Sequence, residues 1–447
     1  MLAIFVAVAW IASGETIRVQ FGEAIKLRDT HDFRVKHVPA GLGCGHFYIE
    51  EQREWPDAVY RVKMAGPTIE ILDVTKKHAY YQACKPGIYF VEVAMLFDSF
   101  KLPEEDDLQI NKNSTCMLIN EEKNSFKYAQ RFNLSVQSVN VTACEEKTKI
   151  GVWENTDTSN SIAEELSHTQ VFVGKLGGKA LCKHKHLTLA LRKGCEKFDS
   201  LLKNVNDKVQ FVKVGKRCSG RTANTVLPDS DISPRRVCMF GDSHMERYQE
   251  VLQGFGRRNL DFVFCSIRGL PPDMIPELRK CTGYLLSAES RVNISLVDAL
   301  SRMHCNDVLI NFGSWPMSYH LFNNPALAYP ISQYKSDIRK VVTSIGDVVE
   351  ATQTRLYWVS INPSPLVGDM ATCPPTGYRY PHLLELYNQA AADVIASPQL
   401  RSYRIGYIDN YRIGKHLADV SDVTLHYGIR TPSSRGFRTN ILDCLGL

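Results

Sequence analysis

Hydrophobic and polar residues alternate through the first part of the chain. Between Glu15 and Cys144, short runs place an apolar side chain at every second position, and turn residues separate them. These runs are IRVQF, FRVKHV, HFYIE, AVYRVKM, TIEILDV, YFVEVAMLF and FNLSVQSVNV. A period of two residues is typical of strands that bury one face. Several such strands without a helical pattern between them predict a β-sandwich over residues 15–148.

The pattern changes near residue 234. From there to the C-terminus the apolar runs are continuous, at 237–240, 262–265, 308–312, 356–361 and 407–408. Strands that are buried on both faces of a parallel sheet need such runs. Between them, apolar residues recur at helical spacing from Tyr334 to Val349 and from His382 to Ala396. This alternation predicts a doubly wound, mainly parallel α/β sheet over residues 234–447, with reactive groups at the carboxyl ends of its strands.

Residues 149–233 show neither pattern clearly. They hold a polar cluster at 155–161 and a glycine-rich bend at 174–178, together with three cysteines, Cys182, Cys195 and Cys218. We expect a connecting region here, in which disulfides stabilise a segment without a strong core of its own. Cys182 lies close to His184 and His186, but paired soft ligands at zinc spacing are missing, so no metal is expected.

The N-terminus is almost wholly apolar from Met1 to Ala12 and continues with Ser13 and Gly14. This stretch is short for a membrane span but has the length of a signal-peptide core, although no Lys or Arg precedes it. We predict that residues 1–14 are a cleaved signal peptide; a buried N-terminal strand and a membrane anchor are the alternatives. The mature chain would then have no stable membrane span and would be secreted or held in the ER or Golgi lumen.

The cysteines and glycosylation sequons agree with that compartment. The chain has 13 cysteines and no C-x-x-C pair, which favours disulfides formed in an oxidising lumen. Because the number is odd, at least one thiol is free or pairs outside the chain. The N-x-S/T sequons, which we expect to be glycosylated, stand at Asn113, Asn133, Asn140 and Asn293.

The charge of the chain argues against one class of partner. The formal net charge is +5 over 447 residues, and Lys and Arg are interleaved with Asp and Glu. A protein that follows a phosphate backbone concentrates its positive charge in a patch or stripe. No nucleic-acid partner is therefore expected.

A candidate nucleophile follows the first apolar strand of the α/β region, where the sequence reads Gly241-Asp242-Ser243-His244. A serine on a tight turn from a strand into a helix is exposed at the strand's carboxyl end. The helix N-terminus then offers backbone N–H groups where an oxyanion would develop during acyl transfer. The alternative is that Asp242 or Ser243 simply caps the following helix.

An acid and an imidazole stand near the C-terminus, in Ser421-Asp422-Val-Thr-Leu-His426. A neutral histidine can take the proton of a serine, and a carboxylate on its other nitrogen fixes the tautomer and stabilises the imidazolium. Together with the upstream serine, Asp422 and His426 predict a catalytic triad.

A third block, Asp307 to Pro316, again follows an apolar strand. The backbone N–H of Gly313 could face the same pocket as Ser243, and Asn311 could add an amide donor. Burial of Asn311 with satisfied hydrogen bonds is the alternative. Trp315 is either a platform for stacking a sugar or a core residue.

The blocks GDSH, NFGSW and DVTLHYG resemble those of the PC-esterase branch of the SGNH/GDSL hydrolases. That branch includes trichome-birefringence-like polysaccharide O-acetyltransferases, the sialic-acid O-acetyltransferase, and the neurexophilin and PC-esterase domain proteins. The resemblance covers residues 235–447 through motifs and the N-terminal half through layout. Cys84 to Phe97 is similar to the G-x-Y-x-V-x-V strand of filamin-type immunoglobulin-like domains; an unrelated β-hairpin is the alternative there.

The resemblance implies a flavodoxin-like SGNH sheet preceded by an immunoglobulin-like β-sandwich. It also implies Ser243 as nucleophile, His426 as general base, Asp422 as its acid, and the N–H groups of Ser243 and Gly313 as oxyanion donors. Gly241 and Asp242 would be structural parts of the nucleophile block. Arg268, with Arg247 and His244, is a candidate for substrate binding, and no cofactor is implied.

Two departures from the superfamily pattern keep alternatives open. The usual spacing is D-x-x-H, whereas three residues separate Asp422 from His426, so Asp419 or Asp409 could be the acid, or the site could be degraded. Trp315 also stands where many SGNH enzymes have an asparagine.

Two functions follow from these residues. The first is an ester hydrolase or O-acyltransferase acting on acylated, in particular acetylated, carbohydrate. The alternative is a catalytically weak or inactive secreted glycoprotein that binds glycan or protein partners, the latter through the N-terminal β-sandwich.

Overall fold

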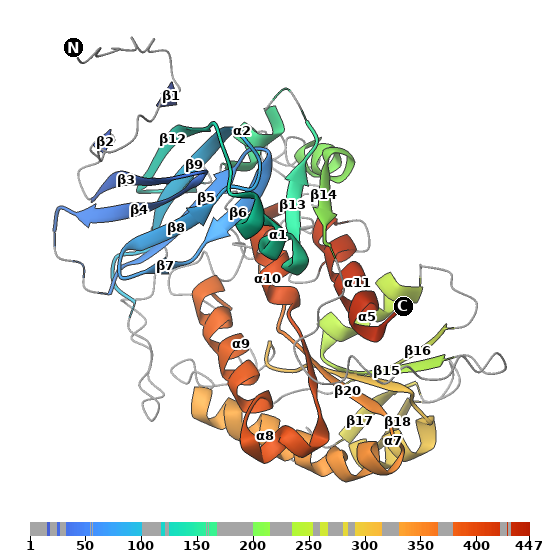
Figure 1. Ribbon diagram of the computed structural model, residues 1–447. Helices are drawn as coiled ribbons and strands as arrows, with labels where there is room; N and C mark the ends of the chain where they lie inside the picture. The colour runs from blue at the N-terminus through green and yellow to red at the C-terminus, as the bar shows by residue number, and fades with distance from the viewer. Residues whose placement is uncertain are drawn as a thin grey trace, which may run out of the picture. The chain divides into compact units, whose positions relative to one another are not determined.

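The computed structural model describes residues 16–17, 25–26, 33–53, 55, 57–100, 118–120, 125–157, 159, 161–167, 200–214, 235–253, 260–266, 280–284, 291–314, 330–364, 379–420, 427 and 431–447. The chain divides into two compact units (Figure 1). Described residues up to 214 belong to the first unit, and those from 235 onward belong to the second.

The first unit contains two large sheets that are antiparallel apart from one parallel edge pair, β1 with β12. One sheet has the order β1 (Thr16–Ile17), β12 (Ala129–Val136), β9 (Gly87–Phe97), β5 (Val59–Ala65), β6 (Thr68–Leu72), β13 (Val152–Asn155) and β14 (Val209–Val212). The other has the order β2 (Ile25–Lys26), β3 (Phe33–Gly41), β4 (Cys44–Glu51), β8 (His78–Gln82) and β7 (Val74–Thr75). A short hairpin pairs β10 (Ile119–Asn120) with β11 (Ser125–Phe126).

The two large sheets share one hydrophobic core. Phe33 and Phe47 come to it from one sheet, and Val62, Val91 and Leu134 come from the other. Every second residue of β4 from Gly45 to Ile49 is buried, as a strand with one covered face requires. The runs that form β3, β4 and β12 therefore bury the face that their period indicates, whereas β5 and most of β9 are buried on both faces.

Tyr89 fixes the turn that precedes β9. Its buried hydroxyl donates to the carbonyl oxygen of Lys85 at 2.9 Å and lies 3.1 Å from the hydroxyl of Thr68. A disulfide joins Cys84 of the same turn to Cys144 in α1 (Val141–Ile150). One disulfide is thus present in this unit, and among the described cysteines Cys44 is a free thiol. Cys182, Cys195 and Cys218 of the expected connecting region lie outside the described residues.

Two of the sequon asparagines lie in described structure of this unit. Asn133 is half-buried in β12, and the side chain of Asn140 caps α1 by accepting the N–H of Ala143 at 3.1 Å. Asn113 lies outside the described residues, and of Asn293 only the backbone, in a strand of the second unit, is described.

Part of the expected connecting region adds to the first sheet. Strand β13 pairs with β6 and with β14, and the buried Trp153 packs on Phe211 with ring centroids 5.1 Å apart. Helix α2 (Ser161–Ser167) buries Ile162 and Leu166. Strands β13 and β14 have four residues each, which is too short for a period of two to stand out in the sequence.

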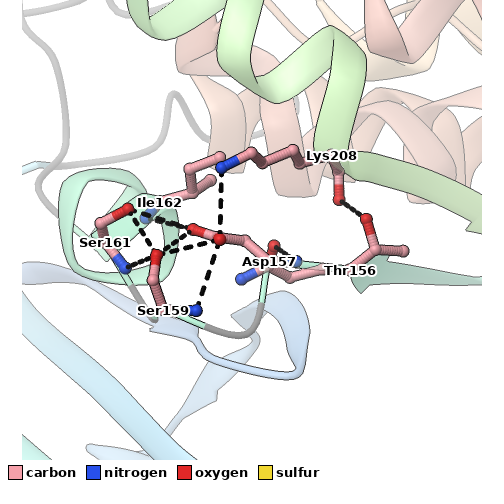
Figure 2. Close-up of polar contacts among 7 residues, drawn as sticks. Thr156, Asp157, Ser159, Ser161, Ile162 and Lys208 are labelled. Atoms are coloured by element: carbon pink, nitrogen blue, oxygen red, sulfur yellow. Dashed lines mark hydrogen bonds and ion pairs between the residues drawn. The ribbon is translucent and has the colours of Figure 1, made fainter.

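Asp157 organises the chain between β13 and α2 (Figure 2). Its carboxylate accepts hydrogen bonds from the hydroxyls of Ser159 and Ser161, from the N–H of Ile162 at 3.3 Å, and from the ammonium of Lys208 at 3.2 Å. Burial by itself would raise the pKa of Asp157, but these hydrogen bonds outweigh it and hold that pKa below its ordinary value.

Replacing Asp157 by alanine is expected to lower the free energy of unfolding of the first unit by about 1 kcal/mol at neutral pH, the usual cost of losing a helix cap. Because the folded pKa lies below that of the unfolded chain, near 3.9, the stabilisation is present above that value and is lost as the pH falls through the folded pKa. Urea denaturation of both proteins at several pH values measures this. Equal midpoints at pH 7 would show that the network contributes nothing.

The second unit is built on a seven-stranded sheet. Its order is β18 (Arg291–Ser295), β17 (Lys280–Tyr284), β16 (Leu260–Ser266), β15 (Arg235–Gly241), β19 (Asp307–Ile310), β20 (Arg355–Val359) and β21 (Gly406–Ile408). Five neighbouring strands are parallel, namely β16, β15, β19, β20 and β21, which confirms the predicted α/β sheet. Strands β17 and β18 add an antiparallel edge. In chain order the parallel strands stand as second, first, third, fourth and fifth, which is the flavodoxin-like doubly wound order.

Helices follow the strands of this sheet. They are α5 (Ser243–Gln253), α7 (Leu296–Met303), α8 (Ile331–Ala351), α9 (Pro381–Ile395), α10 (Asn410–Gly414) and α11 (Pro432–Leu445). The helical spacing of the sequence predicted α8 and α9, whose apolar residues are buried. A disulfide joins Cys238 in β15 to Cys305 just after α7. None of the helices in the described part of the chain combines the length and apolar composition needed to cross a bilayer.

Candidate active site at the carboxyl end of the parallel sheet

The turn from β15 into α5 holds the candidate nucleophile. Gly241 ends the strand, and a side chain there would collide with neighbouring atoms, because its Cβ would lie 2.7 Å from the carbonyl oxygen of Asn311 and 2.8 Å from Cβ of Met245. Asp242 accepts the N–H of His244 on Oδ1 at 2.9 Å and thereby closes the turn. Ser243 is the first residue of the helix and is half-buried.

This turn lies at the topological switch point of the sheet. Strand β15 pairs in parallel with β16 on one side and with β19 on the other, and Phe240 is in register with Ile310. Ser243 and Gly313 each stand three residues beyond these partners, on neighbouring strand ends. In doubly wound sheets, ligands bind in the crevice outside the carboxyl ends of the strands at such a point.

Gly313 has a backbone that favours glycine. Its φ is 133°, and a Cβ would lie 2.6 Å from Cδ1 of Ile361 and 3.1 Å from Cε2 of Tyr334. Glycine adopts this conformation without a steric penalty. The backbone after β19 can therefore turn at Gly313 while Tyr334 and Ile361 stay packed.

Asn311 points into the sheet and is fully occupied as a donor. Its buried amide nitrogen donates to the carbonyl oxygens of Val359 at 2.8 Å and Ser360 at 3.0 Å. In this arrangement neither amide hydrogen is available to an oxyanion, which agrees with the alternative of structural burial. Asn311 joins the carboxyl ends of β19 and β20.

A buried polar network lies beside the nucleophile turn. The ring of His244 contacts Oγ of Ser314 through Nε2 at 3.2 Å and Nδ2 of Asn362 through Nδ1 at 3.3 Å. The hydroxyl of Tyr248 bonds to Oδ1 of Asn362. The sequence suggested His244 as a substrate-binding group near the mouth, but its side chain is 3% exposed and engaged inside this network. Ser314 stands in the NFGSW block but was not singled out, and Asn362 and Tyr248 carried no motif that would mark them.

Asp242 is a buried carboxylate at the centre of the turn. Burial raises its pKa to about 6, and the backbone N–H groups of His244 and Ser314 and the charge of Arg379 pull the pKa down against that effect. The contacts of Asp242 are those of a structural residue, as the family resemblance implies.

Four predicted site residues lie outside the described part of the chain: Asp422, His426, Trp315 and Arg268. Tyr427, the residue after His426, is described. Its hydroxyl donates to the carbonyl oxygen of Pro363 at 2.5 Å, and its ring packs on Phe437, which in turn packs on Tyr248 of α5.

The other candidate residues have local roles. Asp409 caps α10 by accepting the N–H of Arg412, and burial raises the pKa of Asp409. Asp419 is buried in a 3₁₀ segment, Lys415–Val420. Arg247 forms an exposed ion pair with Glu250. Among the described residues, no group of three or more His, Cys, Asp or Glu side chains is placed to hold a metal ion.

Comparison with known proteins gives distant structural likenesses. No protein-family model matches the chain, and no curated protein matches it significantly. Among solved structures, a GDSL-like lipase from Bacteroides thetaiotaomicron is 12% identical with a TM-score of 0.31, over 48% of this chain and 88% of the lipase. A candidate acylhydrolase from Bacteroides fragilis is 13% identical with a TM-score of 0.32, over 49% of this chain and 91% of that protein. At these values the chemistry has to be derived from the residues of this chain.

Proposed function

We propose that the second unit is a serine-dependent acyl ester hydrolase or O-acyltransferase that acts on O-acylated, in particular O-acetylated, carbohydrate. One observation carries the proposal. Ser243 begins a helix at the switch point of a doubly wound sheet, beside the strand end that leads to Gly313. A hydroxyl in that position meets helix N–H groups at the crevice where substrates of such folds bind.

In the proposed mechanism, Oγ of Ser243 attacks the ester carbonyl while His426 takes the hydroxyl proton and Asp422 orients the imidazole. The N–H groups of Ser243 and Gly313 stabilise the negative charge on the carbonyl oxygen. Collapse of the intermediate releases the first sugar hydroxyl, which receives the proton from His426. Water or a second sugar hydroxyl then attacks the acyl-enzyme and regenerates Ser243. No cofactor enters either step.

Hydrolysis and transfer share this acyl-enzyme, so the outcome depends on the acceptor. We propose hydrolysis as the main outcome, with transfer to a sugar hydroxyl as the alternative. The preference for carbohydrate rests on the family resemblance. The predicted signal peptide and the sequons favour an activity in the secretory pathway or outside the cell.

The position of Tyr427 supports a triad completed by the C-terminal tail. Tyr427 packs through Phe437 against Tyr248, which lies five residues after Ser243 on α5. The residue adjoining His426 is therefore linked by side-chain packing to the helix that begins at the nucleophile.

The identity of the acid can be tested directly. We expect Asp422→Ala to slow hydrolysis of a small acetyl ester by orders of magnitude, and Asp419→Ala and Asp409→Ala to leave kcat per folded molecule unchanged. Asp409 already caps α10, and thermal unfolding of each variant separates lost stability from lost chemistry. A normal rate for Asp422→Ala combined with a collapsed rate for Asp419→Ala or Asp409→Ala would move the acid to that residue.

We also infer that the first unit is an immunoglobulin-like sandwich. Its strands β3, β4, β8 and β7 stand in the order of the A, B, E and D strands, and β12, β9, β5 and β6 in that of G, F, C and C′. The bond from Tyr89 near the start of β9 back to Lys85 has the form of the tyrosine corner of that fold.

A second candidate function, recognition of a glycan or protein partner, is favoured by one surface. His46 and Tyr48 on β4 stand opposite Tyr80 and His78 on β8, with paired ring centroids 5.1 and 4.8 Å apart. These rings alternate with the core residues Phe47, Ala79 and Tyr81 and therefore lie on the outer face, where Tyr80 is 65% exposed. Exposed rings of this kind suit stacking on sugars or on a protein surface.

A fluorophosphonate probe decides between the two functions. It phosphonylates a serine that is activated as a nucleophile, and mass spectrometry of the digested protein locates the label. Labelling at Ser243, together with loss of acetyl groups from acetylated glycans, supports the enzyme. Folded protein that is not labelled at Ser243 would favour the binding function.

A further inference from the structure

The hydrogen bonds around His244 have a consistent direction. The phenol of Tyr248 donates to Oδ1 of Asn362, so the Nδ2 group of that amide faces His244. Because an amide nitrogen can only donate, Nδ1 of His244 accepts, and the ring proton sits on Nε2. Nε2–H then donates to Oγ of Ser314 at 3.2 Å. With the Asn362 amide in this orientation, the contacts assign a neutral imidazole with its proton on Nε2.

The same residues lie beside the two proposed oxyanion donors. The backbone N–H of His244 donates to Oδ1 of Asp242, and the backbone N–H of Ser314 lowers the pKa of the same carboxyl group. Ser243 lies between Asp242 and His244, and Gly313 immediately precedes Ser314. His244, Ser314 and Asn362 are each at most 3% exposed, so water does not compete for these bonds.

We propose that His244 is a positioning residue that sets the separation between the nucleophile turn and the Gly313–Ser314 turn. Its neutral ring joins the two through Ser314, and the N–H groups of Ser243 and Gly313 are thereby held toward the same point. The inference rests on the proposed function and assigns His244 a task that acts through the two turns.

Four substitutions separate the two ring contacts. His244→Gln keeps a donor near the position of Nε2 and can retain the bond to Ser314. His244→Asn keeps an acceptor near the position of Nδ1, facing Asn362, but cannot reach Ser314. His244→Leu removes both contacts, and Ser314→Ala removes the acceptor from the other side.

The measurements are kcat and KM for p-nitrophenyl acetate, the rate of fluorophosphonate labelling, and the midpoint of thermal unfolding. We expect His244→Asn and Ser314→Ala to lower kcat by about 10²-fold, as loss of an oxyanion donor does, with KM little changed. His244→Gln should recover most of kcat. The double variant His244→Asn/Ser314→Ala should be no slower than the slower single variant, because both changes break one link.

Several results would overturn the inference. A merely structural His244 would lower the unfolding midpoint in all variants while leaving kcat per folded molecule unchanged. Equal kcat losses for His244→Gln and His244→Asn would show that the bond to Ser314 is not what matters. If His244→Leu does not fold, the Gln and Asn variants still give the comparison. Wild-type protein that is not labelled at Ser243 would refute the proposed function itself, whereas normal labelling of both wild type and His244→Asn would refute the inference alone.

Discussion

Ser243→Ala is expected to abolish the release of acetate from a small acetyl ester, with a fall in kcat of roughly 10⁶-fold. Ser243 is the first residue of α5 at the carboxyl end of β15, where its hydroxyl would form the acyl-enzyme bond. Alanine keeps the helix start, since Asp242 rather than Ser243 accepts the N–H of His244. The loss would therefore be chemical, and it is measured as initial rate against enzyme concentration.

A second serine provides the matched control. Ser301 lies exposed on α7, and its hydroxyl bonds to the carbonyl of Val297 within the same helix. Ser301→Ala should hydrolyse the ester at the wild-type rate, and the fluorophosphonate label should remain on Ser243. If Ser243→Ala and Ser301→Ala are equally active, Ser243 is not the nucleophile.

The parallel sheet could be predicted because its strands are buried on both faces. Val237, Cys238, Met239 and Phe240 are each 0% exposed, and a run of that composition fits the centre of such a sheet. Strand β17 reads Lys-Cys-Thr-Gly-Tyr and pairs at the antiparallel edge, where no continuous apolar run is needed. The edge of the sheet was therefore not visible in the sequence, whereas its centre was.

The candidate site, too, could be predicted from the sequence only in part. The turn at Gly241 and Ser243 could be predicted because a glycine, an acid and a serine directly follow a strand. The bond between His244 and Asn362 joins residues 118 positions apart, at the ends of different strands. No spacing rule connects them, so the polar network beside the proposed oxyanion donors becomes evident only when the strand ends are brought together.

The largest expected loss of stability comes from a residue at the amino ends of the parallel strands, opposite the candidate site. Asp307, the first residue of β19, is fully buried and accepts hydrogen bonds from Nε of Arg235 and Nε of Arg355, both at 2.7 Å. These arginines begin the two neighbouring strands, and each also donates to the carbonyl of Leu445 at the end of α11. The carboxylate of Asp307 thus links three strands, and its two arginine partners join these strands to the last helix.

Asp307→Leu should lower the free energy of unfolding of the second unit by about 3–5 kcal/mol, because it leaves two largely buried guanidinium groups without their counter-ion. The pair Arg236–Asp261 on the adjoining strands β15 and β16 is the control, since its N–O distance is also 2.7 Å but its side chains are 29% and 39% exposed. Asp261→Leu should cost at most about 1 kcal/mol. Hydrogen exchange measured by mass spectrometry on peptides from β15, β19 and β20 reports the second unit separately from the first.

The comparison also separates stability from chemistry within one sheet. Asp307 stands at the amino ends of the parallel strands and Ser243 at their carboxyl ends, so folded Asp307→Leu protein at low temperature should still be labelled at Ser243 by the fluorophosphonate. Equal protection losses for Asp307→Leu and Asp261→Leu would mean that burial does not set the strength of these ion pairs. Loss of labelling in folded Asp307→Leu would mean that the amino and carboxyl ends of the parallel strands are coupled. The separate contacts of Asp307 and Asp242 do not predict such coupling.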